Sequence, residues 1–130
     1  RLEGQSKNYG VPIVVSETTI GLAPDLAAVE LDWLQVKGRR EPVKVYGLLG
    51  DTAMAHTPRF QGVLAAHTRF LALYRAQQWD EALAQLDRCA ALEPELEYLY
   101  ELYRGRITLY AANPPGMDWD GVFVAYAKGA

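Results

Sequence analysis

The sequence predicts an α+β protein in two parts, and three observations support this. In residues 1–50, short runs of β-branched and aromatic residues alternate with turns rich in Gly, Pro and charge, which is typical of strands. From about residue 58 onward, apolar side chains recur at three- and four-residue steps, as they do in helices. Residues 1–50 are neutral, with six basic and six acidic side chains, so residues 51–130 hold the whole net charge of −3.

Composition excludes several classes of protein. The net charge of −3 argues against a nucleic-acid surface. The single cysteine, Cys89, cannot form an internal disulfide, which fits a reducing cytoplasm. No apolar run approaches the ~20 residues that span a bilayer. We therefore expect a cytoplasmic segment that binds neither nucleic acid nor membrane, although its parent protein can be anchored to a membrane through upstream segments.

The first elements are a helix end, a strand and a short helix. Residues 1–9 are mostly polar and are followed by Gly10, a typical helix terminator. The run 11–15 is almost wholly apolar, as in a strand buried on both faces. Ser16 can cap a short helix that Pro24 stops.

A β-hairpin is predicted from two strand-like runs, residues 29–36 and 43–46, which flank a charged loop with Gly38 and Pro42. The alternation in the first run has Val29, Leu31 and Trp33 on one face, Glu30 and Asp32 on the other, and then Leu34 and Val36 on that second face. Such a switch predicts a bulge, or a strand buried on both faces near its end. Strand, helix, strand and strand make half of an α/β or α+β domain, which cannot close a core alone.

The second part is predicted to be helical. Residues 51–57 are small and polar enough for a linker, and residues 58–113 form a helical segment. Within it, the apolar spacing predicts one helix over about 58–77, a second from about Trp79, and a third that begins near Pro94 and ends at Asn113. Residues 114–130 are predicted to form an extended tail.

Three features of the second part could be mistaken for sites. The tyrosines Tyr98, Tyr100, Tyr103 and Tyr110 suggest either a binding groove or, as we favour, a helix facing the core with hydroxyls at its rim. Residues 118–121, Asp-Trp-Asp-Gly, offer too few oxygen ligands for a calcium loop and predict a turn. His56 and His67 are isolated in the sequence, and no catalytic constellation follows from them.

The first fifty residues carry a family resemblance. RLEGQSKNYGVPIVVSETT, followed by ELDWLQVKGRREPVKVYGLLG, resembles the C-terminal third of a class III adenylate/guanylate cyclase catalytic domain, in motif order and in spacing. The Pro-Pro and Asp-Trp-Asp-Gly-Val-Phe tail is similar to that of bacterial cyclases with an N-terminal sensor domain. The resemblance implies that residues 1–50 are the C-terminal portion of a ferredoxin-like cyclase domain.

What the resemblance implies about chemistry falls on two residues. Arg1 stands at the family's arginine that stabilises the transition state, and Lys37 stands at the lysine that contacts the nucleotide's phosphates. The implied reaction converts ATP to cyclic AMP and pyrophosphate in a homodimeric parent, with Mg²⁺ or Mn²⁺ as cofactor. GTP remains an alternative substrate, because the family's purine-selecting residues would precede Arg1.

Other family residues would also precede Arg1, namely the two metal-binding aspartates and an asparagine four residues before that arginine. We therefore expect this chain alone to bind no metal and to have no cyclase activity. Without the resemblance, we would interpret Arg1 as a solvated helix residue. Lys37 then belongs with Arg39 and Arg40 to a charged loop that serves solubility.

A second resemblance lies at the first helical turn. Residues 74–83, continued by residues 91–94, are similar to one tetratricopeptide repeat, in which a small alanine (Ala82) lets two helices approach and an aromatic residue (Trp79) fills the wedge near the turn. A single repeat cannot bury both of its faces. The alternative to a cyclase fragment is accordingly a non-catalytic helical module for protein interaction or dimerisation.

Overall fold

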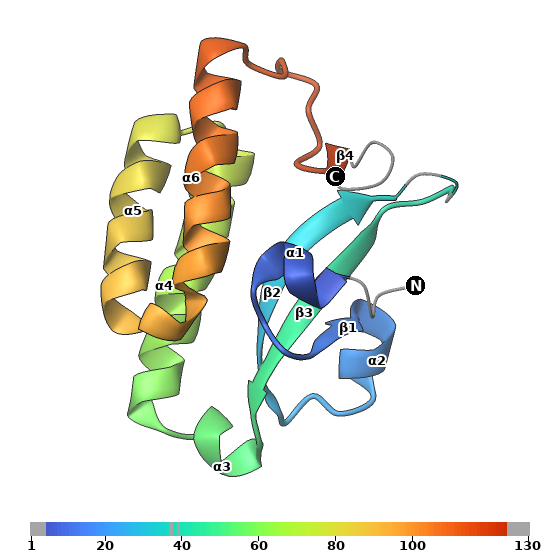
Figure 1. Cartoon of the computed structure of the whole chain (residues 1–130), viewed down its shortest axis with the longest axis vertical. Coiled ribbons are helices and arrows are strands. Elements are labelled where there is room, and N and C mark those ends of the chain that lie inside the picture. The colour runs from blue at the N-terminus through green and yellow to red at the C-terminus, as the bar shows by residue number, and fades with distance from the viewer. Residues whose placement is uncertain (1–4, 37, 39, 125–130) are drawn as a thin grey trace. The chain divides into compact units, whose positions relative to one another are not determined.

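The computed structural model describes residues 5–36, 38 and 40–124, and this part of the chain forms two compact units. The sheet unit holds the described residues as far as Thr57 and then Val122, Phe123 and Val124. The helical unit is Pro58–Gly121. In sequence, the helical unit is therefore an insertion before the last strand of the sheet (Figure 1).

The sheet unit has a four-stranded mixed sheet in the order β1-β3-β2-β4. Its elements are α1 (Gln5–Tyr9), β1 (Val14–Ser16), α2 (Glu17–Gly21), β2 (Ala27–Gln35), β3 (Val43–Gly50), α3 (Thr52–Ala55) and β4 (Phe123–Val124). Both β1 and β2 run antiparallel to β3, whereas β4 lies parallel to β2 (Figure 1). The predicted α+β class is confirmed at this level.

The β2–β3 hairpin has a register shift of the kind that a bulge gives, which is one of the two outcomes that the alternation predicted. The register moves from Glu30 opposite Tyr46 to Asp32 opposite Val45, so it skips Leu31. Leu31 and Asp32 are both buried as a result.

Short elements of the sheet unit follow local rules. Ser16 caps α2 as predicted, since its hydroxyl accepts a hydrogen bond from the Thr19 amide at 3.1 Å. The predicted strand over residues 11–15 is shorter and later, β1 being Val14–Ser16, and Val11 is buried just before it. Gly47 on β3 leaves room for its neighbours, because a Cβ there would lie 3.1 Å from Leu31 Cδ2 and 3.3 Å from Val11 Cγ2.

The helical unit consists of three long helices and one short turn. They are α4 (Pro58–Arg75), α5 (Trp79–Leu92), the 3₁₀ turn η1 (Pro94–Leu96) and α6 (Glu97–Ala112). The long helices lie where the apolar spacing predicted them, although Pro94 begins the 3₁₀ turn rather than α6 itself. None of the described helices is long and apolar enough to cross a membrane.

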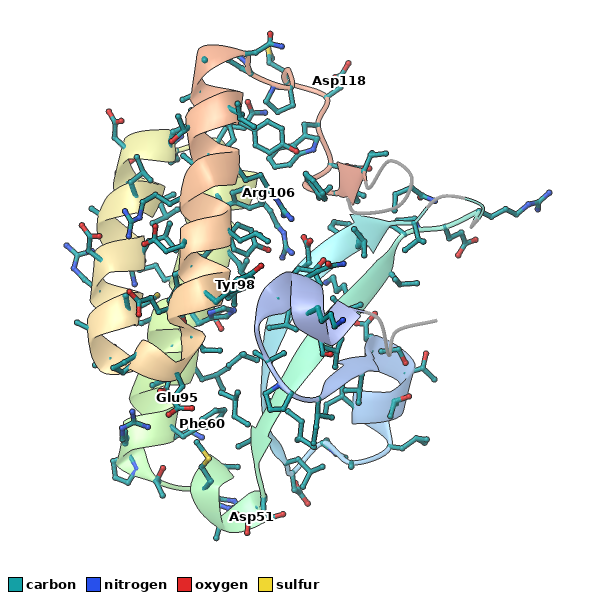
Figure 2. The ribbon with its side chains drawn as sticks, viewed as in Figure 1. Asp51, Phe60, Glu95, Tyr98, Arg106 and Asp118 are labelled. Carbon is teal, nitrogen blue, oxygen red and sulfur yellow. The ribbon has the colours of Figure 1, made fainter. Side chains whose placement is uncertain are left out.

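Aromatic rings fill the interior of the helical unit between α4 and α6. Tyr103 makes edge contacts with Phe70 and Tyr74, with ring centroids 5.0 and 4.9 Å apart. All three rings are buried. Arg106 lies over the Tyr103 ring, with 4.8 Å from its guanidinium carbon to the ring centroid (Figure 2).

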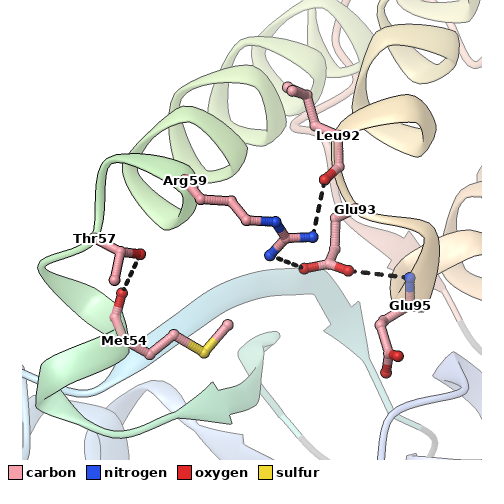
Figure 3. A network of polar contacts seen from close by, with 6 residues as sticks. All are labelled: Met54, Thr57, Arg59, Leu92, Glu93 and Glu95. Carbon is pink, nitrogen blue, oxygen red and sulfur yellow. Dashed lines mark hydrogen bonds and ion pairs between the residues drawn. The ribbon is translucent and has the colours of Figure 1, made fainter.

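A polar clamp joins the start of α4 to the end of α5 (Figure 3). Arg59 donates from Nη1 to the Glu93 carboxylate at 3.1 Å and from Nη2 to the Leu92 carbonyl at 3.2 Å. The other carboxylate oxygen of Glu93 accepts from the Glu95 amide at 3.1 Å and so caps η1. Glu93 can be buried because these donors satisfy its carboxylate.

Short regular elements lie on either side of the helical unit, within the described part of residues 51–57 and of residues 114–130. Within residues 51–57, α3 forms with Asp51 as its cap, and the Asp51 side chain accepts from the Met54 amide at 3.0 Å. After α6, the described residues as far as Gly121 belong to the helical unit. Phe123 and Val124 then pair with Leu34 and Gln35 of β2.

Candidate functional site

The two residues predicted for catalysis, Arg1 and Lys37, lie outside the described residues. What the structure describes is the framework on either side of them. The segment that begins with Arg1 leads into α1, and β2 leads through Val36 to Lys37. Of this candidate site, the structure therefore describes only the neighbouring elements α1 and β2.

In the hairpin loop, Gly38, Arg40 and Glu41 are exposed, and the backbone turns at Gly38. Gly38 has φ of +88°, in the left-handed region that favours glycine. Arg40 is exposed, as expected for a loop residue. At the start of β3, Lys44 lies over the Trp33 ring, with 5.2 Å from Nζ to the ring centroid. This stacking holds one basic side chain on the strand that returns from the loop.

A buried hydrogen bond joins α1 to β2. Tyr9, the last residue of α1, donates from Oη to Asp32 Oδ2 at 2.7 Å. The other oxygen of Asp32 accepts from the Trp33 amide at 2.9 Å. The two side chains are 3% and 1% exposed. Sequence reasoning missed this contact, and the change of apolar parity in β2 is the one signal that could have pointed to it.

The tyrosines of α6 mostly face the core, which is the interpretation we favoured. Tyr100 and Tyr103 are buried and Tyr110 is half-buried, whereas Tyr98 is 57% exposed (Figure 2). Tyr110 contacts the Trp79 and Trp119 rings, at 5.6 and 5.1 Å between centroids. Trp119 lies in the predicted turn, where its amide donates to the Gly116 carbonyl at 3.2 Å.

His67 is not isolated in the structure. It is buried on α4, and its Nδ1 lies 3.0 Å from the Tyr100 hydroxyl. Burial raises the pKa of Tyr100, and the nearby Cys89 adds to this effect. A raised pKa favours the neutral phenol.

The described residues contain no group of three or more His, Cys, Asp or Glu side chains that could hold a metal ion. A scan against protein-family models finds no match, and searches among curated proteins and among solved structures find none either.

Proposed function

We propose that residues 1–50 are the C-terminal portion of a class III nucleotide cyclase catalytic domain, and that the intact protein converts ATP to cyclic AMP and pyrophosphate. One observation carries the proposal. The elements follow the order that the motifs require: a helix end, a strand, a capped short helix and an antiparallel hairpin whose loop contains the Val-Lys-Gly motif.

In this proposal, Arg1 and Lys37 share the handling of phosphate. When the ribose 3′-hydroxyl attacks the α-phosphorus, negative charge grows on the phosphoryl oxygens and on the departing pyrophosphate. The planar guanidinium of Arg1 suits the spread charge, because it can bind two oxygens at once. The ammonium of Lys37 suits a terminal phosphate as a point charge. The divalent metals of the family would neutralise and orient the triphosphate, and their ligands would precede Arg1.

The helical unit has a separate role in the proposal, as a tetratricopeptide-like segment that transmits signals or supports homodimerisation. The packing of α4 on α5 supports this part. Ala82 is fully buried, and the Trp79 ring meets Tyr74 edge-on at 6.1 Å between centroids.

Kinetics of a protein that extends this chain before Arg1 would test the proposal. We expect Arg1→Ala to lower kcat by roughly hundredfold, because the guanidinium acts on charge that develops in the transition state. Lys37→Ala should mainly raise the KM for the nucleoside triphosphate, since a phosphate contact is already made in the bound substrate. The assay measures cyclic nucleotide formed from ATP and, in parallel, from GTP.

Arg40→Ala is the matched control, because Arg40 is an exposed cation of the same loop and has no proposed role. It should change kcat and KM by less than about twofold. Unchanged turnover in both Arg1→Ala and Lys37→Ala would remove the catalytic assignment.

A further inference from the structure

We infer that α6 carries the surface by which the helical unit associates with a second copy of this chain, and that two α6 helices pack antiparallel there. The inference rests on the dimerisation part of the proposed function and is independent of its cyclase part. It assigns that dimerisation to one face of one helix.

The outward face of α6 is apolar, although its inward face already fills the core. The inward side chains are completely buried, namely Leu99, Tyr100, Tyr103 and Ile107. Roughly opposite to them on the helix lies an outer stripe of five residues at steps of four and three, Tyr98, Leu102, Gly105, Leu109 and Ala112. Tyr98 is 57% and Leu109 is 73% exposed. Because a surface helix normally has a polar outer face, the outer stripe indicates contact with another element.

The spacing of the outer stripe is that of a seam between two helices. Steps of four and three residues repeat every seven, which keeps one narrow line of side chains turned toward a second helix. Gly105 lies at the centre of this line and is exposed. A Cβ placed on Gly105 would meet none of the described atoms within 4 Å. There is accordingly room at Gly105 for a side chain from another molecule.

An antiparallel second α6 fits the outer stripe. When Leu102 of each copy lies opposite Gly105 of the other, the leucine side chain occupies the open space at the glycine. Tyr98 of each copy then lies opposite Leu109 of the other. Both contacts occur twice, as a twofold axis requires. In a parallel pair, each residue would lie beside its own copy, so glycine would meet glycine and leave a gap.

Charges beside the outer stripe favour the same arrangement. Glu101 and Arg104 lie along one edge of it, and Arg104 Nε donates to the Glu101 carboxylate at 3.2 Å within one chain. Arg104 Nη2 also donates to Asp87 on α5 at 3.0 Å. All three side chains are partly exposed, so they can accept further partners. In the antiparallel pair this edge faces the same edge of the other copy in reverse, which brings Glu101 of each copy near Arg104 of the other. This charge complementarity is why the occupant that we propose is a second copy.

The size of the surface predicts a weak dimer. Helix α6 has 16 residues, which corresponds to a length of about 24 Å. One helix pair of this length buries less area than a standard stable interface, which is about 1,600 Å². We therefore expect a dimer that dissociates on dilution.

Sedimentation equilibrium of the whole chain, from about 1 to 300 μM, tests for this dimer. The average mass of the wild type should rise toward that of a dimer. Gly105→Glu places a charge at the centre of the outer stripe, and we expect it to lower the association constant at least tenfold, roughly as for an unpaired charge at an interface. Its melting temperature should not fall, because glutamate favours a helix more than glycine does.

Gly62→Glu is the matched control. Gly62 is an exposed glycine within α4, and a Cβ there would also meet none of the described atoms within 4 Å. This variant introduces the same charge and the same gain in helix propensity at a site outside the outer stripe. Its association constant should stay within about twofold of wild type.

Charge reversal tests the antiparallel orientation. Glu101→Arg alone and Arg104→Glu alone each bring like charges together across the pair, so each variant should self-associate about three- to tenfold more weakly than wild type. An equimolar mixture of the two variants should associate as strongly as wild type, because every facing pair then has opposite charges.

Three results would overturn the inference. The first is a wild-type chain that stays monomeric over the whole concentration range, and the second is wild-type association in Gly105→Glu. The third is a mixture of the charge-reversal variants that associates no more strongly than either variant alone. The cyclase part of the proposed function fails separately, if the extended wild-type protein forms no cyclic nucleotide or if Arg1→Ala and Lys37→Ala leave its turnover unchanged.

Discussion

Burial governs the chemistry of Cys89. Its side chain is 1% exposed on α5, and removal from water disfavours the thiolate. The pKa of the thiol rises from 9.0 to about 11, although a hydrogen bond with Tyr100 and the charge of Arg88 oppose the rise. Because the thiolate is the reactive form, Cys89 should behave as an apolar core residue.

We expect Cys89 to react with a thiol reagent at pH 8 at least tenfold more slowly in the native protein than in urea, roughly as its burial requires. Stability should also depend on pH. The folded-state pKa is raised, so the contribution of the thiol is fully present below about pH 9 and is lost as the pH rises through about 11. Urea unfolding at several pH values measures this loss.

Cys89→Ala should make the decline of unfolding free energy between pH 9 and 11 shallower, because the titrating thiol is gone. Part of the decline should remain, since burial raises the pKa of Tyr100 as well. Equal reaction rates in native and unfolded protein would contradict the prediction.

Among single residues, the contact between Tyr9 and Asp32 could not be predicted from the sequence. The two residues are 23 positions apart, and simple alternation only places Asp32 on the face opposite Val29 and Leu31. The parity switch predicted a bulge or a strand buried on both faces, but a pattern of apolar residues does not locate the extra residue of a bulge. Arg1 and Lys37 were named from motifs alone and remain predictions.

Among the elements, the clamp of Arg59 on Glu93 is the most informative. Arg59 is 58% exposed, whereas Glu93 is 4% exposed, so the ion pair has one solvated partner and one buried partner. Loss of the exposed partner would leave a buried carboxylate with fewer donors, which costs more than the pair itself contributes.

Arg59→Ala should therefore lower the free energy of unfolding by about 1–2 kcal/mol, measured by urea denaturation. Arg104→Ala is the control, because Arg104 pairs with two exposed carboxylates, those of Asp87 and Glu101. Its removal should cost less than about 0.5 kcal/mol. Equal losses in the two variants would show that the burial of Glu93 has no energetic consequence.

Elements differed in how well the sequence predicted them. Helices α4, α5 and α6 were predicted because each carries many apolar residues at a regular spacing, and this signal accumulates along its length. Strand β4 has two residues, Phe123 and Val124, and exists only through pairing with β2. A strand so short carries no periodic signal, so its partner can be known only from the tertiary structure.

For the molecule as a whole, the order of the two units along the chain has a consequence for the sheet. Deletion of residues 122–130 removes β4 and uncovers the edge of β2 at Leu34 and Gln35. We expect amide hydrogen exchange of residues 33–36 to speed up by at least tenfold, because local opening of an edge needs less free energy. Exchange in α5 should be unaffected.

Phe123→Ala serves as the control for that deletion, since it shortens one side chain and keeps the backbone that pairs with Leu34. Exchange of residues 33–36 should stay within about threefold of wild type in this variant. Unaltered exchange after the deletion would show that β4 contributes nothing to the end of β2.

The late position of β4 also bears on synthesis. A ribosome releases the chain from its amino end, and domains generally fold as units while they emerge. Strand β4 therefore cannot pair with β2 until all of Pro58–Gly121 has been translated. Until then the edge of β2 that pairs with β4 can pair with another nascent chain. Rapid translation through the three helices would shorten this period and so reduce the risk of aggregation.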